Sequence, residues 1–341
     1  MTRVALDVRA LEHPELAERG IGRYVASLSE ALREQPVDVV ELRRLARPHA
    51  PERVRELWEH ALLARDVRAA HADVLHSPTI DYASVRPGVP HVVTVHDLAP
   101  LEHPERYLRT GVKHRLRYAS VKRAARVITP SMTVAGNCAR MLDVDPGRIA
   151  VVREAPAPVF RPHPDPDAVL AHLDLPDRYL LWVGGLDPPD PRKGVERLAH
   201  TVVTHGGLPL VLAGRADSTA AALAGRGHVQ LVGRLEDDEL AALYTCADAL
   251  VFPSEDEGFG LPPVEALACG TPVVAFAATA LIETLAAEPG ATLVEPGDYN
   301  ALLEAAERVA GTRAPIPTRT WSDVAVETIA VYEEARGNAS T

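Results

Sequence analysis

Short apolar runs alternate with helical patterns along the chain, and this alternation limits the fold more than any other feature. In the first half, the apolar runs that predict strands are residues 3–8, 37–42, 73–76, 91–95, 126–129 and 149–153. Helical patterns between them include 22–34, 52–70, 106–124 and 131–142. Strands alternating with helices are typical of parallel sheets covered by helices. The sequence therefore predicts an α/β fold.

A proline-rich stretch divides the chain into two such series. Residues 155–167, APAPVFRPHPDPD, contain five prolines and are typical of a linker. Predicted strands restart after it at 179–183, 208–213, 228–232, 249–252, 272–276 and 291–294, before a final helix at about 322–336. At 341 residues the chain is also too long for one typical core. We predict two doubly wound, Rossmann-like domains facing a cleft, with ligands beyond the carboxyl ends of the strands.

Composition narrows the function classes. Residues 1–156 hold 24 Lys+Arg and 20 Asp+Glu, whereas residues 157–341 hold 12 and 27, which argues against nucleic-acid binding. No apolar run is long enough for a transmembrane helix, and the charged N-terminus lacks the apolar core of a signal peptide. Cys138, Cys246 and Cys269 show no paired spacing. We expect a cytoplasmic protein without a metal cluster.

Residues 253–270, PSEDEGFGLPPVEALACG, carry the strongest functional signal. An apolar run precedes them, and the Pro262-Pro263 pair suits the first turn of a helix. A glycine loop between strand and helix presents free amides and the positive end of the helix dipole, which favour phosphate. Glu257 in the loop and Glu265 in the helix can accept hydrogen bonds from hydroxyl groups. A sugar nucleotide offers hydroxyls on both sides of a diphosphate.

The string GFGLPPVEALACGTPVV resembles the E-x7-E signature of the retaining, family 4 glycosyltransferases. The resemblance covers nearly the whole chain and implies the GT-B architecture. It implies an N-terminal acceptor-side domain of residues 1–156 plus the C-terminal helix 322–341, and a donor domain of residues 157–321. In this family the first Glu contacts the donor sugar and the second contacts the ribose. Those positions here are Glu257 and Glu265, with the donor loop made by Gly258, Phe259, Gly260 and Leu261.

Two further turns of the second half match donor-binding positions of the family. Residues 183–194, VGGLDPPDPRKG, follow a strand, and a glycine turn with Arg192 and Lys193 suits a diphosphate. Lys193 matches the family lysine, Gly184 and Gly185 form the turn, and Gly185 stands where many members have a second phosphate-binding Arg. Near 228–240, the resemblance places Arg234, Leu235 and Asp237 beside the base. The alternatives are an ordinary basic helix start and a plain turn with Asp237 near the N-cap.

The first half contributes weaker signals. Gly20 and Gly22 resemble a family glycine loop beside the donor phosphates and sugar, and the alternative is a flexible turn with a helix start. His96 ends an apolar strand and matches the family histidine that faces the donor sugar, although a lone histidine there is more often structural. Ser131 is favoured as a helix cap.

Basic residues gather in 106–126, at positions Arg106, Arg109, Lys113, Arg115, Arg117, Lys122, Arg123 and Arg126. Such a stretch can contact an anionic membrane weakly or an anionic acceptor, but a solvated helix face is the favoured interpretation.

We therefore predict a retaining glycosyltransferase that moves a sugar from a nucleoside diphosphate sugar to the hydroxyl of a small-molecule or oligosaccharide acceptor. Its catalytic residues would be His96, Glu257 and Lys193. The donor is expected to be a UDP-sugar, with GDP and dTDP as alternatives, and no metal or permanent cofactor is expected. The high-GC composition and the resemblance to avilamycin-type antibiotic enzymes point to antibiotic biosynthesis, with polysaccharide or glycolipid assembly as the alternative.

Other function classes remain open from the sequence. A nucleotide-sugar epimerase and an α-glucan phosphorylase share this architecture, although no lysine context for pyridoxal phosphate is evident. A non-catalytic nucleotide-sugar binding module would need a broken donor site, whereas both glutamates and Lys193 are present. A membrane-associated assembly protein would rest on the basic stretch alone.

Overall fold

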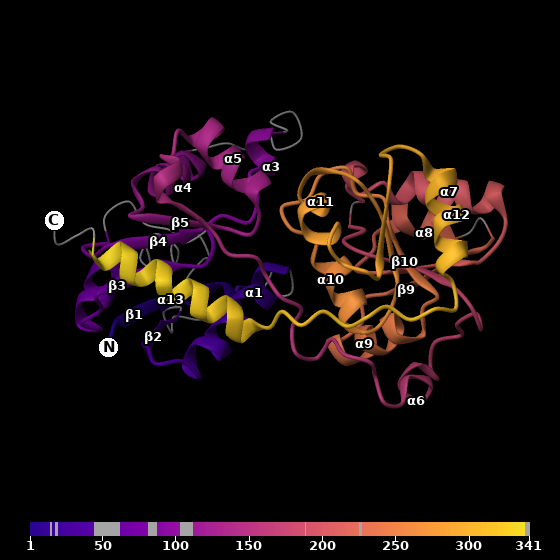
Figure 1. The fold of residues 1–341 in the computed structure, drawn as a ribbon, viewed down its shortest axis with the longest axis horizontal. Coiled ribbons are helices and arrows are strands. Elements are labelled where there is room, and N and C mark those ends of the chain that lie inside the picture. The colour runs from indigo at the N-terminus through magenta and orange to yellow at the C-terminus, as the bar shows by residue number, and fades with distance from the viewer. Residues whose placement is uncertain are drawn as a thin grey trace. The chain divides into compact units, whose positions relative to one another are not determined.

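A computed structural model of the chain describes residues 1–13, 16–17, 20–43, 62–80, 87–102, 112–187, 189–224 and 227–337. The chain forms two compact units, Met1–Glu154 with Thr320–Thr341, and Ala155–Arg319. Each unit contains a six-stranded sheet in the described residues, and the strands within each sheet pair in parallel. The prediction of two parallel α/β sheets is confirmed (Figure 1).

The first unit has the strand order β2-β1-β3-β4-β5-β6. Its strands are β1 (Arg3–Asp7), β2 (Asp38–Leu42), β3 (Val74–Ser77), β4 (His91–Thr94), β5 (Arg126–Thr129) and β6 (Ile149–Val151). Its helices include α1 (Gly20–Arg33), α3 (Ala99–Glu102), α4 (Val112–Arg123) and α5 (Met132–Leu142), with short 3-10 turns η1 (Arg9–Glu12) and η2 (Pro146–Arg148). The Ser131 hydroxyl accepts a hydrogen bond from the amide of Val134 at 3.2 Å, so Ser131 caps α5 as predicted.

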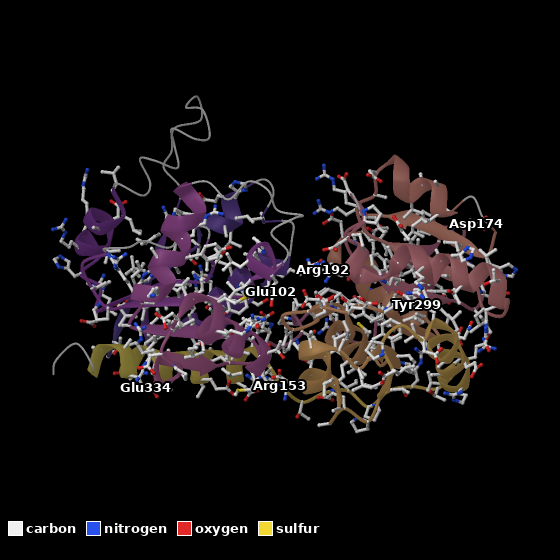
Figure 2. All side chains as sticks on the ribbon, turned by 90° about the horizontal axis from the view of Figure 1, so that it is seen from above. Glu102, Arg153, Asp174, Arg192, Tyr299 and Glu334 are labelled. Atoms are coloured by element: carbon white, nitrogen blue, oxygen red, sulfur yellow. The ribbon has the colours of Figure 1, made fainter. Side chains whose placement is uncertain are left out.

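The last helix, α13 (Trp321–Gly337), belongs to this first unit. It packs along α1 and against β3, β4 and β5 (Figure 1). The Tyr332 hydroxyl bonds Nδ1 of His76 at 2.7 Å inside the core, and Glu334 pairs with Arg126 at 3.3 Å at the surface (Figure 2). The buried residues of α13 run from Trp321 to Ala335, which is more than three turns. The helix is therefore an integral part of the unit.

The second unit has the strand order β12-β11-β10-β7-β8-β9. Its strands are β7 (Leu180–Val183), β8 (Leu210–Ala213), β9 (Val229–Gly233), β10 (Ala249–Phe252), β11 (Val273–Phe276) and β12 (Ala291–Val294). Its helices are α6 (Pro166–Leu170), α7 (Val195–His205), α8 (Ser218–Ala224), α9 (Asp237–Cys246), α10 (Leu261–Ala268), α11 (Thr279–Leu285) and α12 (Tyr299–Val309), with the 3-10 turn η3 (Pro191–Lys193).

Alternate residues of the central strand β7 enter two different cores of this unit. Leu181 and Val183 pack in one cluster with α9 and α10, whereas Leu180 and Trp182 pack in the other with α7 and α12. A parallel strand covered on both faces needs apolar residues at every position, which explains the continuous apolar runs in the sequence. Polar function is therefore displaced to the loops at the strand ends.

Part of the basic stretch 106–126 lies outside the described residues, which omit 103–111. Lys122 pairs with Asp143 at 2.9 Å, and Arg126 donates to the carbonyl of Gly147 as well as pairing with Glu334. These two cations thus hold neighbouring segments together. Across the described part of the chain, no helix is both long and apolar enough to cross a bilayer.

Glycines follow three neighbouring strands of the second sheet at their carboxyl ends. Gly184 follows β7, Gly214 follows β8, and Gly233 ends β9. The amide of Gly184 donates to Ala213 at 3.0 Å, and the amide of Gly214 donates to Gly233 at 2.8 Å. A Cβ at Gly214 would overlap the Gly184 carbonyl, and one at Gly184 would lie 2.6 Å from the Trp182 ring. The backbones at this edge therefore approach as closely as glycine permits.

Replacing Gly214 by alanine should destabilise the second unit by roughly 2–4 kcal/mol, because the side chain meets backbone and φ is +148°. Chemical denaturation followed by tryptophan fluorescence would measure the loss. Gly185→Ala is the matched control, because a Cβ there meets nothing within 4 Å. Equal stability of the two variants would contradict the close approach.

Candidate functional site

The loops after β7 and β10 converge at the carboxyl edge of the second sheet. The guanidinium of Arg192 donates to Asp190 from Nη2 at 2.7 Å and to Asp256 from Nη1 at 2.8 Å. The amide of Glu255 donates to the carbonyl of Arg192 at 2.9 Å. Burial raises the pKa of Asp190, but its hydrogen bonds with Arg192 outweigh burial and hold that pKa below the ordinary value. The two loops are thus fastened by the side chain of Arg192, which is labelled in Figure 2, and by backbone.

Lys193 and Glu257 form an ion pair beside this fastening, so the predicted phosphate cation and the predicted sugar-binding carboxylate are adjacent. Nζ of Lys193 lies 6.0 Å from the centre of the Phe252 ring. The amide of Glu257 donates to Oγ1 of Thr279 at 3.0 Å. Glu257 is therefore held through its side chain and its backbone.

The glycine loop ends at α10 as the sequence predicts. Gly260 is the N-cap with φ +91°, and the prolines occupy the first turn of α10. A Cβ at Gly260 would lie 2.6 Å from Leu281 of α11. This position therefore favours glycine both for its positive φ and for the lack of space. The two residues after Leu261 are prolines, which have no backbone N–H. The first turn of α10 therefore offers few amide donors to a ligand. Phe259 is buried against the unit and Gly258 precedes it in the loop.

Glu265 is almost fully buried on α10, with a relative exposure of 1%. Its Oε2 accepts a hydrogen bond from the Tyr244 hydroxyl of α9 at 3.0 Å. A buried carboxylate needs such donors to remain ionised. In this structure the carboxylate is thus directed into the protein at Tyr244, a partner that the sequence did not indicate.

The turn before α9 contains the residues predicted beside the base. Arg234 is exposed, and Leu235 packs against the core on the α9 side of the sheet. Glu236, one residue before Asp237, is the N-cap of α9, and its amide donates to Glu239 at 2.9 Å in a capping box. Asp237 is the first helical residue, so it lies next to the N-cap, as the alternative of a plain turn predicted.

The glycine motif of the first unit is helical from its start. Gly20 is the first residue of α1, and Gly22 lies within the first turn. A Cβ at Gly22 would lie 2.7 Å from the carbonyl oxygen of Leu16 and would overlap Ala17. The helix-start alternative is therefore the observed one, and the glycine at 22 permits close packing of the preceding backbone.

His96 follows β4 by two residues, and both of its ring nitrogens contact the protein. Nδ1 lies 3.0 Å from Oε1 of Glu154, and Nε2 lies 2.9 Å from the Pro78 carbonyl oxygen. Burial lowers the pKa of His96, but the hydrogen bond and charge of Glu154 outweigh burial and raise that pKa above 6.5. An imidazolium that donates from both nitrogens satisfies these acceptors.

The structure thus brings together Lys193, Glu257 and the glycine loop in the second unit, whereas Glu265 is buried on α10 of the same unit. His96, Gly20 and Gly22 lie in the first unit. Sequence reasoning missed Asp190, Asp256 and Glu154. The Asp-Pro-Arg order at 190–192 is a signal for the first of these, because an Asp two residues before an amide commonly accepts its hydrogen bond. Among the described residues, no group of three or more His, Cys, Asp or Glu side chains is arranged to hold a metal.

Two family models match the chain, one in each unit. The model described as Glycosyltransferase Family 4 matches residues 14–154, and the model described as Glycosyl transferases group 1 matches residues 177–311.

The curated relatives of the chain are named as glycosyltransferases or mannosyltransferases. The D-inositol 3-phosphate glycosyltransferase of Salinispora tropica is 32% identical over 323 residues, 80% of this chain and 66% of that protein. A D-inositol 3-phosphate glycosyltransferase 2 of Catenulispora acidiphila is 30% identical, over 74% of this chain and 67% of that protein. The O-antigen chain mannosyltransferase RfbU of Salmonella typhimurium is 29% identical, over 60% and 57%. The chain thus aligns with about two thirds or less of the length of each.

Solved structures share the fold along the whole chain. Sucrose-phosphate synthase from Thermosynechococcus elongatus has a TM-score of 0.71 at 23% identity, covering 100% of this chain and 98% of that one. Anabaena HepE in complex with UDP-glucose has a TM-score of 0.67 at 17% identity, covering 100% of both chains. AviGT4, a glycosyltransferase involved in avilamycin A biosynthesis, has a TM-score of 0.66 at 20% identity, covering 99% of both. The predicted GT-B fold is confirmed.

Replacing Glu154 by glutamine should lower the pKa of His96, because the neutral amide no longer stabilises the imidazolium. The folded-state pKa is raised above 6.5, so the stability from this pair is fully present below 6.5 and is lost as the pH rises through the folded value. NMR titration of the His96 ring, with thermal unfolding from about pH 6 to about pH 8, would measure both effects.

Glu334→Gln is the control for this titration, because it removes an exposed carboxylate from the same unit. It should leave the pKa of His96 unchanged. A wild-type His96 that titrates at or below 6.5 would show that Glu154 does not hold the charged form.

Proposed function

The chain belongs to the family of group 1 and family 4 glycosyltransferases, and on this premise we propose that it is a retaining enzyme that uses a nucleoside diphosphate sugar. The observation that carries the proposal is the Lys193–Glu257 ion pair at the carboxyl edge of the second sheet, beside the Gly260 cap of α10. Ligands of open parallel sheets bind at this edge. Lys193 supplies a cation for phosphate and Glu257 an acceptor for sugar hydroxyls.

Donor binding would exchange partners at this pair. The diphosphate takes the ammonium of Lys193, and the sugar hydroxyls then replace Lys193 as the donors to Glu257. Positive charge beside the departing nucleoside diphosphate stabilises the charge that develops as the glycosidic bond breaks. Because Glu257 accepts hydrogen bonds from the sugar hydroxyls in this scheme, it is not assigned as a nucleophile. Retention is assigned to front-face attack, in which the leaving phosphate assists deprotonation of the acceptor hydroxyl. No metal or permanent cofactor is required in this scheme.

UDP-sugars are the first donors to test, because the similar Anabaena structure contains UDP-glucose. GDP-sugars and dTDP-sugars are the alternatives. The acceptor is a hydroxyl of a small molecule or an oligosaccharide that contacts the first unit. Antibiotic or oligosaccharide biosynthesis is our first assignment, and the fold likeness to AviGT4 is consistent with it.

A second pathway, the assembly of a bacterial polysaccharide or glycolipid, is favoured by a specific observation. The relatives detected by sequence include an O-antigen chain mannosyltransferase and inositol phosphate glycosyltransferases. Transfer to a lipid-linked or polymeric acceptor separates this pathway from the first.

Calorimetric titration with UDP, GDP, dTDP and ADP, without metal and then with Mg²⁺, tests the proposal. We expect one nucleoside diphosphate to bind independently of metal. Lys193→Ala should weaken its binding about tenfold or more, because a charge-assisted hydrogen bond to phosphate is lost.

The matched control is Arg178→Ala. Arg178 pairs with Asp248, which also accepts from the amide of Tyr179 just before β7, so the same charge is removed at the opposite edge of the sheet. This variant should bind the nucleotide like the wild type. If no nucleotide binds the wild-type protein, a non-catalytic module replaces the transferase.

A further inference from the structure

All three nitrogens of the Arg192 side chain donate to carboxylates. Nε and Nη2 donate to Oδ2 of Asp190 at 3.0 and 2.7 Å, and Nη1 donates to Oδ2 of Asp256 at 2.8 Å. The side chain is only 14% exposed. A planar guanidinium suits this forked arrangement, which a lysine cannot reproduce.

Arg192 and its neighbour make two successive links between the same loops. Arg192 reaches Asp256, and Lys193 reaches Glu257, the next residue along each loop. The backbone reinforces the first link, because the Arg192 carbonyl accepts from the amide of Glu255 at 2.9 Å. A displacement of Asp256 would therefore carry Glu257 with it.

The charges of the two links differ. Arg192 with Asp190 and Asp256 is one positive group among two negative groups, so this cluster carries a net negative charge. The Lys193–Glu257 pair is neutral. A phosphate approaching Arg192 would meet two carboxylates already bonded to it, which costs electrostatic energy. Lys193 forms its ion pair with Glu257 and is more exposed than Arg192, at 28%.

We propose that Arg192 is a positioning residue and not a phosphate ligand. Through Asp256 it fastens the loop after β10 to the loop after β7, and so sets Glu257 for the donor sugar. The assignment replaces the phosphate contact that the sequence suggested for Arg192. It rests on the proposed function for the sugar-binding role of Glu257, whereas the fastening itself does not.

The variant Asp256→Asn distinguishes a phosphate ligand from a positioning residue, because the two roles of Arg192 predict opposite changes in binding affinity. Removing a competing carboxylate would strengthen nucleoside diphosphate binding if Arg192 were a phosphate ligand. As a positioning residue, Arg192 loses its hold on the loop, and binding of the nucleotide sugar weakens. Wild type, Asp256→Asn and Arg192→Lys would be titrated with UDP and UDP-glucose, and with GDP and GDP-mannose.

The measured quantity is the preference for the nucleotide sugar over the nucleoside diphosphate. Both variants should lower this preference about tenfold, the loss expected for one hydrogen bond to a charged group. Asp256→Glu, which keeps the charge, should recover part of it. Arg178→Lys, at an Arg–Asp pair on the opposite edge, should leave it unchanged. Equal weakening of both ligands, or tighter UDP binding by Asp256→Asn, would overturn the proposal.

Amide hydrogen exchange of the ligand-free protein tests the fastening without any nucleotide. Peptides that contain residues 253–257 should exchange about tenfold faster in Arg192→Lys and Asp256→Asn than in the wild type or Arg178→Lys. Unchanged exchange in both variants would overturn the fastening. A wild type that binds none of UDP, GDP, dTDP and ADP would instead refute the proposed function, and the exchange result would still decide whether Arg192 links the loops.

Discussion

The burial of both faces of each sheet is the constraint on which the rest of the structure depends. In the second unit, adjacent residues of β7 enter opposite cores, so the strand has no polar face to offer. Chemistry is therefore confined to the strand ends, where Gly184, Gly214 and Gly233 bring three backbones close together. The loops that leave this edge carry the candidate site. How accurately their side chains are positioned depends on the contacts that fasten the loops to one another.

That fastening is electrostatic, and it shapes how a ligand can bind. Lys193 already has Glu257 as a partner, so an incoming phosphate exchanges one counter-charge for another and does not meet a free cation. Such an exchange demands less desolvation than burying a new charge, because the ammonium is already partly buried. In the proposed function, the released carboxylate becomes an acceptor for hydroxyl groups at the same moment. Phosphate recognition and sugar recognition would then be coupled through one ion pair.

The sequence predicted the strands and the glycine loop well, because these follow from local patterns. Continuous apolar runs, the prolines in the first turn of α10 and the cap at Ser131 are properties of neighbouring residues. The partners of Arg192 and His96 were missed, because Asp256 and Glu154 are 64 and 58 residues away and no spacing rule connects them. Glycines are common both at a helix start and in a glycine loop, so Gly20 and Gly22 did not distinguish the two. The close approach of Gly22 to Leu16 and Ala17 could not be predicted from the sequence.

The first unit shows how a histidine at a strand end is held by its neighbours. The ring of His96 packs edge-on against the ring of Tyr24 of α1, with the ring centres 4.5 Å apart. The Tyr24 ring also packs edge-on against Trp321, where α13 begins. Glu154, the partner of His96, is the last residue of the first unit before the chain enters the second. The His96–Glu154 contact therefore lies where the chain leaves the unit, and Tyr24 connects it to the point of return. A group placed there for catalysis would be held by the same contacts that complete the fold.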